Sequence, residues 1–164
     1  MLKGFKPVIA IEPKIMILGS MPSIKSLEQV EYYAHKTNRF WKIMSELFNE
    51  PINTYQQKQA IILNHHLLLW DVIDTCIREG SLDSNIKEVV VNDIEGIIKK
   101  YPSITCIICN GKKSYELYLK HFKHLNVKVI SLPSTSSANQ SIKQDELFKV
   151  WIKTIQEELK RSYV

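Results

Sequence analysis

Residues 31–41, EYYAHKTNRFW, place two tyrosines, a histidine, an asparagine and an arginine in one short segment. Tyr32 and Tyr33 come just before an apolar helical pattern, where a ring is harder to explain as core and can stack on a planar ligand. The simpler interpretation is that Asn38 caps the helix and that the aromatic residues after it are core. The segment therefore predicts either an aromatic helix start or the wall of a pocket for a flat ring.

The second candidate is the loop GSMPS, residues 19–23, which directly follows a buried apolar run. Gly19 allows the backbone to approach a ligand closely, and Pro22 stiffens the turn. Backbone N–H groups in such a turn can stabilise an oxyanion. A plain strand-to-loop turn is the alternative interpretation. A phosphate-binding P-loop is excluded because its glycine spacing and its GK[ST] ending are missing.

Asn110 ends another apolar run and precedes a helix, and its amide offers donors as well as an acceptor to the edge of a ligand. A strand cap or a turn former is the alternative interpretation. Lys112 and Lys113 open the following helix, where a positive charge opposes the helix dipole. This unfavourable placement suggests a phosphate nearby, although a solvated helix face also explains it.

A third loop, LPSTSSANQS at residues 132–141, is rich in small hydroxyl side chains. Hydroxyl groups and exposed backbone N–H groups suit contact with a phosphodiester backbone. The alternative is a polar loop that ends in a helix cap before Asp145. Composition alone leaves both interpretations open.

These segments need a scaffold that brings them together, and the apolar pattern predicts one. Short apolar runs indicate buried strands, and longer periodic stretches indicate helices between them. The predicted strands are Ile15–Leu18, Leu67–Val72, Thr105–Cys109 and Val127–Leu132, and the predicted helices include Asn38–Phe48, Lys112–Phe122 and about Asp145–Arg161. Strands that alternate with helices indicate an α/β fold with a mainly parallel sheet and helices on both faces. Ligands bind outside the carboxyl ends of such strands, which is where the three loops gather.

The chain has 164 residues, 45% of them hydrophobic, which suits one folded domain over residues 1–164. Its formal net charge of +5 permits a polyanionic partner without requiring one. The N-terminus lacks the long apolar region of a signal peptide, and no apolar run reaches the roughly 18 residues of a membrane span. We therefore expect a soluble, cytoplasmic protein without a membrane partner.

The three cysteines argue against a disulfide framework because their number is odd. Cys106 and Cys109 form a CxxC motif, but residues three apart on a strand point to opposite faces. We therefore expect no metal or redox site there. A hydrolytic triad is not expected either, because Ser20 and Ser134 have no paired base at a telling position.

Five segments in sequence order resemble the uracil-DNA glycosylase superfamily, and above all its hypoxanthine- or deoxyinosine-DNA glycosylase branch. The mismatch-specific uracil-DNA glycosylases are a neighbouring branch. The segments are GSMPS, YYAHKTNRFWKIM, LLLWDVIDTCIREGSLDSNI, CNGKKSYELY and LPSTSSAN, and the match runs from about residue 5 to about residue 155. The resemblance implies a three-layer α/β/α sandwich around a central, mainly parallel four-stranded sheet. It also implies a monofunctional enzyme without metal or cofactor, in which water cleaves the bond between a deaminated base, hypoxanthine or uracil, and its deoxyribose in DNA.

The resemblance also assigns roles to individual residues. The pocket for the extruded base matches Gly19, Ser20, Met21 and Pro22, with Tyr33 as the stacking ring. Asn38 is the first candidate to place the water and His35 the second, while Asn110 is a candidate to bond the edge of the base. Residues expected to contact the DNA backbone are Ser23, Lys112, Pro133, Ser134, Thr135 and Ser136. We expect the partner to be DNA with a deaminated base, bound by a monomer.

Several positions depart from the superfamily pattern. Met21 stands where many members carry a water-activating Asp or Asn, although the hypoxanthine branch shares this Met. Leu132 stands where a His or Asn often precedes the Pro-Ser pair, so a cationic helper for the leaving group is missing. Ser23 replaces a usual glycine and Ser137 a usual proline, and we expect both changes to loosen their loops and slow the enzyme. Met21, Leu132 and Ser23 favour a second hypothesis, a non-catalytic domain that binds damaged or mismatched DNA. A third hypothesis is a small-molecule hydrolase or nucleotide-binding protein that uses the same strand ends.

Overall fold

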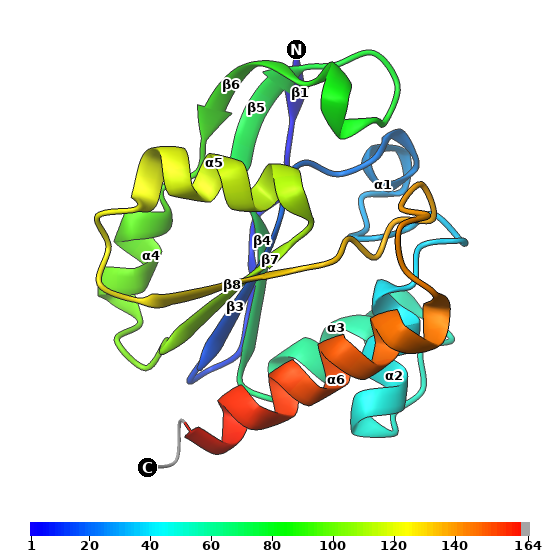
Figure 1. Ribbon diagram of the computed structural model, residues 1–164, viewed down its shortest axis with the longest axis vertical. Coiled ribbons are helices and arrows are strands. Elements are labelled where there is room, and N and C mark those ends of the chain that lie inside the picture. The colour runs from blue at the N-terminus through cyan, green and yellow to red at the C-terminus, as the bar shows by residue number, and fades with distance from the viewer. Residues whose placement is uncertain (162–164) are drawn as a thin grey trace.

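A five-stranded sheet forms the centre of the computed structural model, which describes residues 1–161 (Figure 1). The order is β2-β4-β3-β7-β8, with β2 at Val8–Ile9, β3 at Ile15–Gly19, β4 at Leu67–Asp71, β7 at Cys106–Asn110 and β8 at Lys128–Leu132. β3, β4, β7 and β8 pair in parallel, and the short β2 runs antiparallel to β4 at one edge. The predicted sheet of four mainly parallel strands is therefore confirmed, with β2 added.

The three inner strands are apolar along nearly their whole length because both of their faces are covered. Every residue of β3, β4 and β7 is buried, as expected for parallel strands between two helical layers. Five strand ends differ from the prediction by one residue. β3 and β7 extend to Gly19 and Asn110, and β4 ends at Asp71 instead of Val72. β7 and β8 each begin one residue later than predicted.

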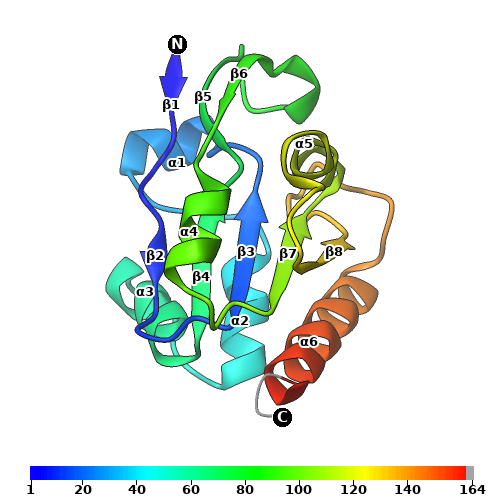
Figure 2. The same ribbon diagram turned by 90° about the vertical axis from the view of Figure 1, so that its left-hand side faces the viewer.

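Helices cover both faces of the sheet, which confirms the three-layer sandwich (Figures 1 and 2). α2 (Phe40–Phe48), α3 (Tyr55–Asn64) and α6 (Gln144–Arg161) cover one face, and α4 (Ile94–Lys100) and α5 (Lys112–Phe122) cover the other. Alternate strand residues serve the two cores: Ile15 and Ile17 pack toward α2 and α6, whereas Met16 and Leu18 pack toward α4 and α5.

A small second sheet, which the sequence did not predict, lies at one end of the molecule (Figure 2). It has the order β1-β5-β6, with β1 at Leu2–Lys3, β5 at Ile73–Ile77 and β6 at Lys87–Val91, all antiparallel. The chain passes from β4 into β5 through Val72, whose N–H donates to the Gly19 carbonyl (2.9 Å). The carboxyl end of β4 is thus enclosed between the two sheets.

The CxxC motif behaves as its strand position predicts. Cys106 packs in the core beside α2 and α6, and Cys109 packs in the opposite core. Both thiols are buried and free. Within residues 1–161, no cluster of His, Cys, Asp or Glu is arranged to hold a metal ion, and no helix there is long and apolar enough to cross a membrane.

Candidate active site

The carboxyl ends of the four parallel strands open into one cavity of about 1070 Å³. Gly19 lies opposite Asp71, and Asn110 lies opposite Leu132, in the strand register. Strand order reverses at β3, because β4 lies on one side of it and β7 on the other, so the cavity occupies the topological switch point. All the predicted site residues line it: Gly19, Ser20, Met21, Pro22, Ser23, Tyr33, His35, Asn38, Asn110, Lys112, Pro133, Ser134, Thr135 and Ser136.

Thr135 connects two of the predicted site residues. Its buried hydroxyl donates to Asn38 Oδ1 (2.9 Å) and accepts from Asn110 Nδ2 (3.0 Å). The Thr135 backbone N–H in turn donates to Asn110 Oδ1 (3.0 Å). A continuous chain of hydrogen bonds therefore joins the end of β7, the loop after β8 and the start of α2, and it fixes these segments relative to one another.

Arg39, and not Asn38, occupies the N-cap position of α2, but Asn38 just before it still binds the first turn. Its Oδ1 accepts from the backbone N–H of Phe40 (2.9 Å) as well as from Thr135. Both lone pairs of this oxygen are therefore occupied, and the Nδ2 amide group is the part of Asn38 that remains to face a ligand. Asn38 can hold a water by donating to its oxygen, while the proton that the water loses must go to another acceptor.

Asn110 is held more tightly than the sequence suggested. Its Nδ2 donates to the Tyr33 hydroxyl (3.1 Å) and to Thr135, and its Oδ1 accepts from the Thr135 N–H. This arrangement makes Asn110 a positioning residue for Tyr33 and Thr135. A direct bond from Asn110 to the base edge remains a prediction, and it has one Oδ1 lone pair available.

Tyr33 is placed to present one ring face to the cavity. Its backbone is in the left-handed region (φ 53°), and its ring stacks on Phe40 with centroids 4.3 Å apart and 26° between planes. Phe40 covers one face, so only the opposite face is available to a base. Burial is the main cause that raises the pKa of the Tyr33 hydroxyl, which therefore stays neutral. Tyr32, by contrast, is a core residue whose hydroxyl donates to the Lys6 carbonyl (2.8 Å), contrary to our expectation.

The loop after β3 is fixed by polar contacts from the segment that follows β5. The Ser20 hydroxyl donates to Asp83 Oδ1 (2.7 Å), and Arg78 Nη2 donates to the Pro22 carbonyl (2.7 Å). Met21 is buried among apolar residues and has no means to orient water. Ser23 caps the short helix α1 (Ile24–Gln29) by accepting from the Ser26 N–H (3.2 Å). Its side chain adds a contact at the end of this loop, and the looser loop expected from Ser23 remains a prediction.

The loop after β8 is anchored from both sides. Arg39, which sequence reasoning missed, donates from Nε to the Thr135 carbonyl (3.2 Å), and Trp151 Nε1 donates to the Pro133 carbonyl (2.9 Å). Gly111 has φ 95°, and a Cβ there would lie 3.1 Å from the Ser134 side chain, so the close approach of the two loops requires glycine.

Ser137 contacts the segment before α2, and the looser loop expected from it remains a prediction. Its hydroxyl forms a hydrogen bond with the Thr37 hydroxyl (2.8 Å), which joins the loop after β8 to the segment before α2. The two departures from the family pattern, at Ser23 and at Ser137, thus each add a contact that glycine or proline could not form.

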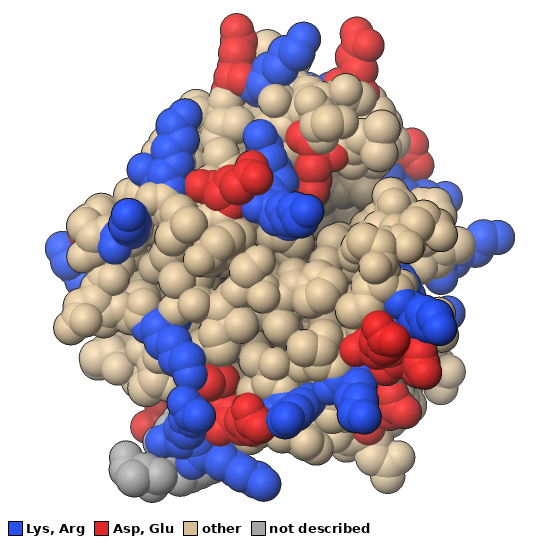
Figure 3. All heavy atoms as spheres, viewed as in Figure 1, with Lys and Arg blue, Asp and Glu red and all other residues tan. Residues whose placement is uncertain are grey.

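His35 and Lys112 are exposed residues at the mouth of the cavity. His35 Nδ1 accepts from the Thr37 N–H (3.2 Å), so a neutral ring carries its proton on Nε2 and has no free nitrogen lone pair to take a proton from water. Figure 3 shows a hollow on this face with mostly uncharged walls, and basic and acidic side chains are interspersed around it. A polyanionic ligand would therefore meet the loops of the cavity as well as its charged rim.

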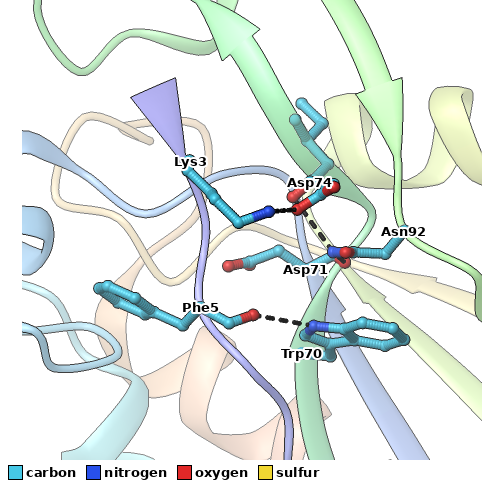
Figure 4. A network of polar contacts seen from close by, with 7 residues as sticks. Lys3, Phe5, Trp70, Asp71, Asp74 and Asn92 are labelled. Carbon is cyan, nitrogen blue, oxygen red and sulfur yellow. Dashed lines mark hydrogen bonds and ion pairs between the residues drawn. The ribbon is translucent and has the colours of Figure 1, made fainter. Parts of the chain in front are cut away.

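Asp71 is the main residue of the cavity that sequence reasoning missed. It is 4% exposed, lines the cavity at the end of β4, and its carboxylate points away from Asn92 (Figure 4). Its main-chain carbonyl accepts from Asn92 Nδ2 (2.8 Å), but its Oδ2 has no hydrogen-bond partner among residues 1–161. The register of β3 against β4 pairs Asp71 with Gly19 and so places it at the cavity. Because the strand was predicted to run on to Val72, Asp71 looked like an interior strand residue.

Comparison with known proteins gives consistent results. Residues 7–156 match the family model described as the uracil DNA glycosylase superfamily. Two relatives named hypoxanthine DNA glycosylase, from Methanosarcina acetivorans and Methanosarcina barkeri, are 33% and 32% identical over 140 residues, which cover 84% of this chain and 88% of each relative. A solution NMR structure from Methanosarcina acetivorans, described as a candidate uracil DNA glycosylase, superposes with a TM-score of 0.83 at 30% sequence identity. The superposition covers 95% of this chain and 97% of the chain of that structure. The chain belongs to the uracil DNA glycosylase superfamily.

Proposed function

We propose that this protein is a DNA glycosylase that removes hypoxanthine from DNA and so begins base-excision repair. The observation that carries the proposal is the convergence of all the predicted site residues on one cavity at the switch point of the sheet. The two Methanosarcina relatives named hypoxanthine DNA glycosylase support hypoxanthine as the base. Uracil is a second candidate substrate, since the family name refers to it.

The target base is unreachable inside a duplex, so it must be flipped into the cavity at a cost of a few kcal/mol. Deaminated bases pair poorly, which lowers this cost and favours them over normal bases. In the proposed complex, the free face of Tyr33 stacks on the flipped base. The loop of Gly19–Ser23 lies against the base and its sugar, held in place by Arg78 and Asp83.

Cleavage breaks the C1′–N9 bond of deoxyinosine, and the electron pair leaves with the base. The water oxygen bonds to C1′, and the water gives up one proton, so the base is released neutral after it takes up one proton. Asn38 Nδ2 fixes the position of this water, because its Oδ1 is occupied by Phe40 and Thr135. DNA phosphates stabilise the positive charge that develops on the sugar, so a strong protein base is not required.

DNA is held by two kinds of group on the rim of the cavity. Ser134 and Ser136 belong to a loop whose backbone is fixed by Arg39 and Trp151, and small hydroxyl residues in such a loop suit phosphate contacts. Thr135 between them is fully buried and its hydroxyl is bonded to Asn38 and Asn110, so it has a positioning role in place of the expected DNA contact. Lys112 is exposed at the start of α5, beside the same loop. Both contacts position the duplex and do not read its sequence.

The test is release of free base from duplex oligonucleotides that contain one deoxyinosine or one deoxyuridine, with each normal base placed opposite. We expect release from deoxyinosine, and a comparison of the two rates ranks hypoxanthine against uracil. Absence of release from both substrates, with folded protein and every opposing base, would refute the proposal.

A second candidate is a non-catalytic domain that binds damaged or mismatched DNA. Met21 and Leu132 favour it, because both are apolar and buried where many superfamily members place a polar group. Such a domain would bind deoxyinosine-containing or abasic DNA more tightly than normal duplex while releasing no base. Binding measured beside base release therefore separates the two candidates.

A further inference from the structure

Asp71 lies on the floor of the cavity, beside the two groups that would contact a flipped base. Its Oδ1 would lie 2.4 Å from a Cβ added at Gly19, and the Tyr33 hydroxyl oxygen would lie 3.0 Å from the same point. A side chain at residue 19 is therefore impossible without displacing Asp71. The glycine leaves the carboxyl group and the Tyr33 hydroxyl side by side over the backbone of the first loop.

Among the buried polar atoms near Asp71, the Nη1 of Arg78 and the Oδ2 of Asp71 itself have no hydrogen-bond partner within residues 1–161, whereas other neighbours bind one another. Asn110, Thr135 and Asn38 form the hydrogen-bonded chain described above, and Ser20 donates to Asp83. Within residues 1–161, Asp71 Oδ2 is buried and has no partner. An unsatisfied buried carboxyl is destabilising, and its retention in a cavity indicates that a ligand supplies the missing partner.

The charged groups that face Asp71 keep it from being fully ionised. Burial is the largest cause that raises its pKa, to about 7, and the negative charge of Asp83 adds to this effect. Arg78 opposes it, but the Arg78 guanidinium donates to the carbonyls of Gly80 and Pro22 and forms no ion pair with Asp71. Tyr33 on the other side is neutral. A substantial fraction of Asp71 is therefore a neutral carboxyl near pH 7, which can donate as well as accept.

We propose that Asp71 contacts the flipped base directly and that its neutral carboxyl donates a hydrogen bond to an acceptor atom of the base as it departs. This inference rests on the proposed function. For hypoxanthine the acceptor is a ring nitrogen or the O6 oxygen, both of which gain negative charge when the C1′–N9 electron pair leaves with the base. The bond strengthens in the transition state, which is the condition for acceleration.

Asp71 thereby supplies what Leu132 cannot. The position before Pro133 carries no cationic side chain, because it is Leu132, the last residue of β8, which is buried in the core. A buried neutral acid that donates a hydrogen bond to a developing anion is an established solution elsewhere in enzymes. The proton can remain shared or pass to the base, and in the second case the proton lost by the attacking water restores Asp71.

The test is the single-turnover rate of hypoxanthine release from a deoxyinosine duplex as a function of pH, with the full chain. Asp71→Asn keeps the size and an N–H donor but cannot titrate, and Asp71→Ala removes the donor. Asp74→Asn is the matched control, since it removes a carboxylate on β5 that pairs with Lys3 outside the cavity.

We expect the wild-type rate to fall as the pH rises through about 7, and Asp74→Asn to behave like the wild type. Asp71→Asn should lose this fall while keeping its rate within about tenfold at about pH 6, and Asp71→Ala should be roughly 100-fold slower there. An Asp71→Asn profile that keeps the wild-type fall, or an Asp71→Ala rate within about threefold of wild type, would overturn the inference. If Asp71→Ala does not fold, the Asp71→Asn profile decides alone.

The same experiment separates this inference from the function beneath it. Wild-type protein that releases neither hypoxanthine nor uracil overturns the proposed function, and the role of Asp71 with it. Active wild-type protein with Asp71 variants of unchanged rate and pH profile overturns the role of Asp71 alone.

Discussion

Arg39 donates two hydrogen bonds to the carbonyl of Thr135, one from its backbone N–H (3.0 Å) and one from Nε (3.2 Å). Its Nη2 reaches the next carbonyl, that of Ser136 (2.7 Å). The start of α2 therefore holds the loop after β8 through one rigid guanidinium group. Since Thr135 also contacts Asn38, the position of the proposed water-holding residue depends on this attachment.

Arg39→Lys should lower the single-turnover rate by about tenfold or more, because an ammonium group cannot reproduce the planar fork of donors to adjacent carbonyls. The affinity for DNA should change less than the rate, since the loop remains present but imprecise. Lys42→Ala, on the exposed side of α2, is a control that should leave both unchanged. Arg39→Lys keeps the positive charge, so a rate equal to that of the wild type would show that the planar attachment does not matter.

Asn38 combines a hydrogen bond to the first turn of α2 with the proposed contact to water, and two substitutions separate these roles. Asn38→Ala loses the bond to the Phe40 N–H and should lower stability by about 1 kcal/mol, whereas Asn38→Ser keeps an acceptor oxygen and should recover most of that loss. Both should lose base release by roughly 100-fold, because neither carries the Nδ2 group. Thermal unfolding and base release are measured on both proteins, and an Asn38→Ser variant with wild-type turnover would leave Asn38 with its bond to α2 only.

Tyr33 is expected to act through its ring more than through its hydroxyl. Tyr33→Phe keeps the stacking face but deprives Asn110 Nδ2 of one acceptor, so stability should fall by about 1 kcal/mol while base release stays within about tenfold. Tyr33→Leu removes the ring and should weaken binding of the flipped nucleotide by about 1–3 kcal/mol. The control ligand is a duplex with an abasic analogue, which has no base to stack. If Tyr33→Leu loses as much affinity for this duplex as for the deoxyinosine duplex, stacking on Tyr33 is contradicted.

Asp71 should make the protein less stable as the pH rises. Its ordinary pKa of 3.8 applies to the unfolded chain, and folding raises the pKa to about 7. Between these values the folded protein holds a proton that the unfolded chain has lost, so the unfolding free energy decreases with rising pH through this window. The full shift corresponds to on the order of 4 kcal/mol.

Urea unfolding at about pH 5 and about pH 8 gives the unfolding free energies of the wild-type and Asp71→Asn proteins. The difference between the two proteins isolates the contribution of Asp71, because the other carboxylates are the same in both. We expect the unfolding free energy of Asp71→Asn to rise relative to that of the wild type from about pH 5 to about pH 8. Parallel pH dependence in both proteins would mean that Asp71 titrates normally when the chain is folded.

The sequence was sufficient to predict the layers, because buried parallel strands and amphipathic helices are local patterns. Leu147, Trp151 and Ile155, for example, form the buried stripe of α6 that their spacing predicts. The second sheet was missed because β6 is mostly exposed and its pairing with β5 is irregular. Its sequence therefore has no clear alternation of apolar and polar residues that would indicate a strand.

The candidate site was predicted as a set of segments but not as a network. Hydrogen bonds such as that between Thr135 and Asn38 join residues 97 positions apart, and no local pattern indicates them. Asp71 was missed for a related reason. Within a predicted run from Leu67 to Val72 it looked like one polar residue inside a strand, and only the register against Gly19 places it at the cavity.

The most direct test of this account is to identify the products formed from a duplex that holds one deoxyinosine. Mass spectrometry of the reaction should detect free hypoxanthine, together with an unbroken strand that carries an abasic site. The Asn38→Ala protein, folded and bound to the same duplex, should yield far less of both. Free hypoxanthine absent from the wild-type reaction, despite measurable binding to the duplex, would contradict the account and leave a protein that only binds damaged DNA.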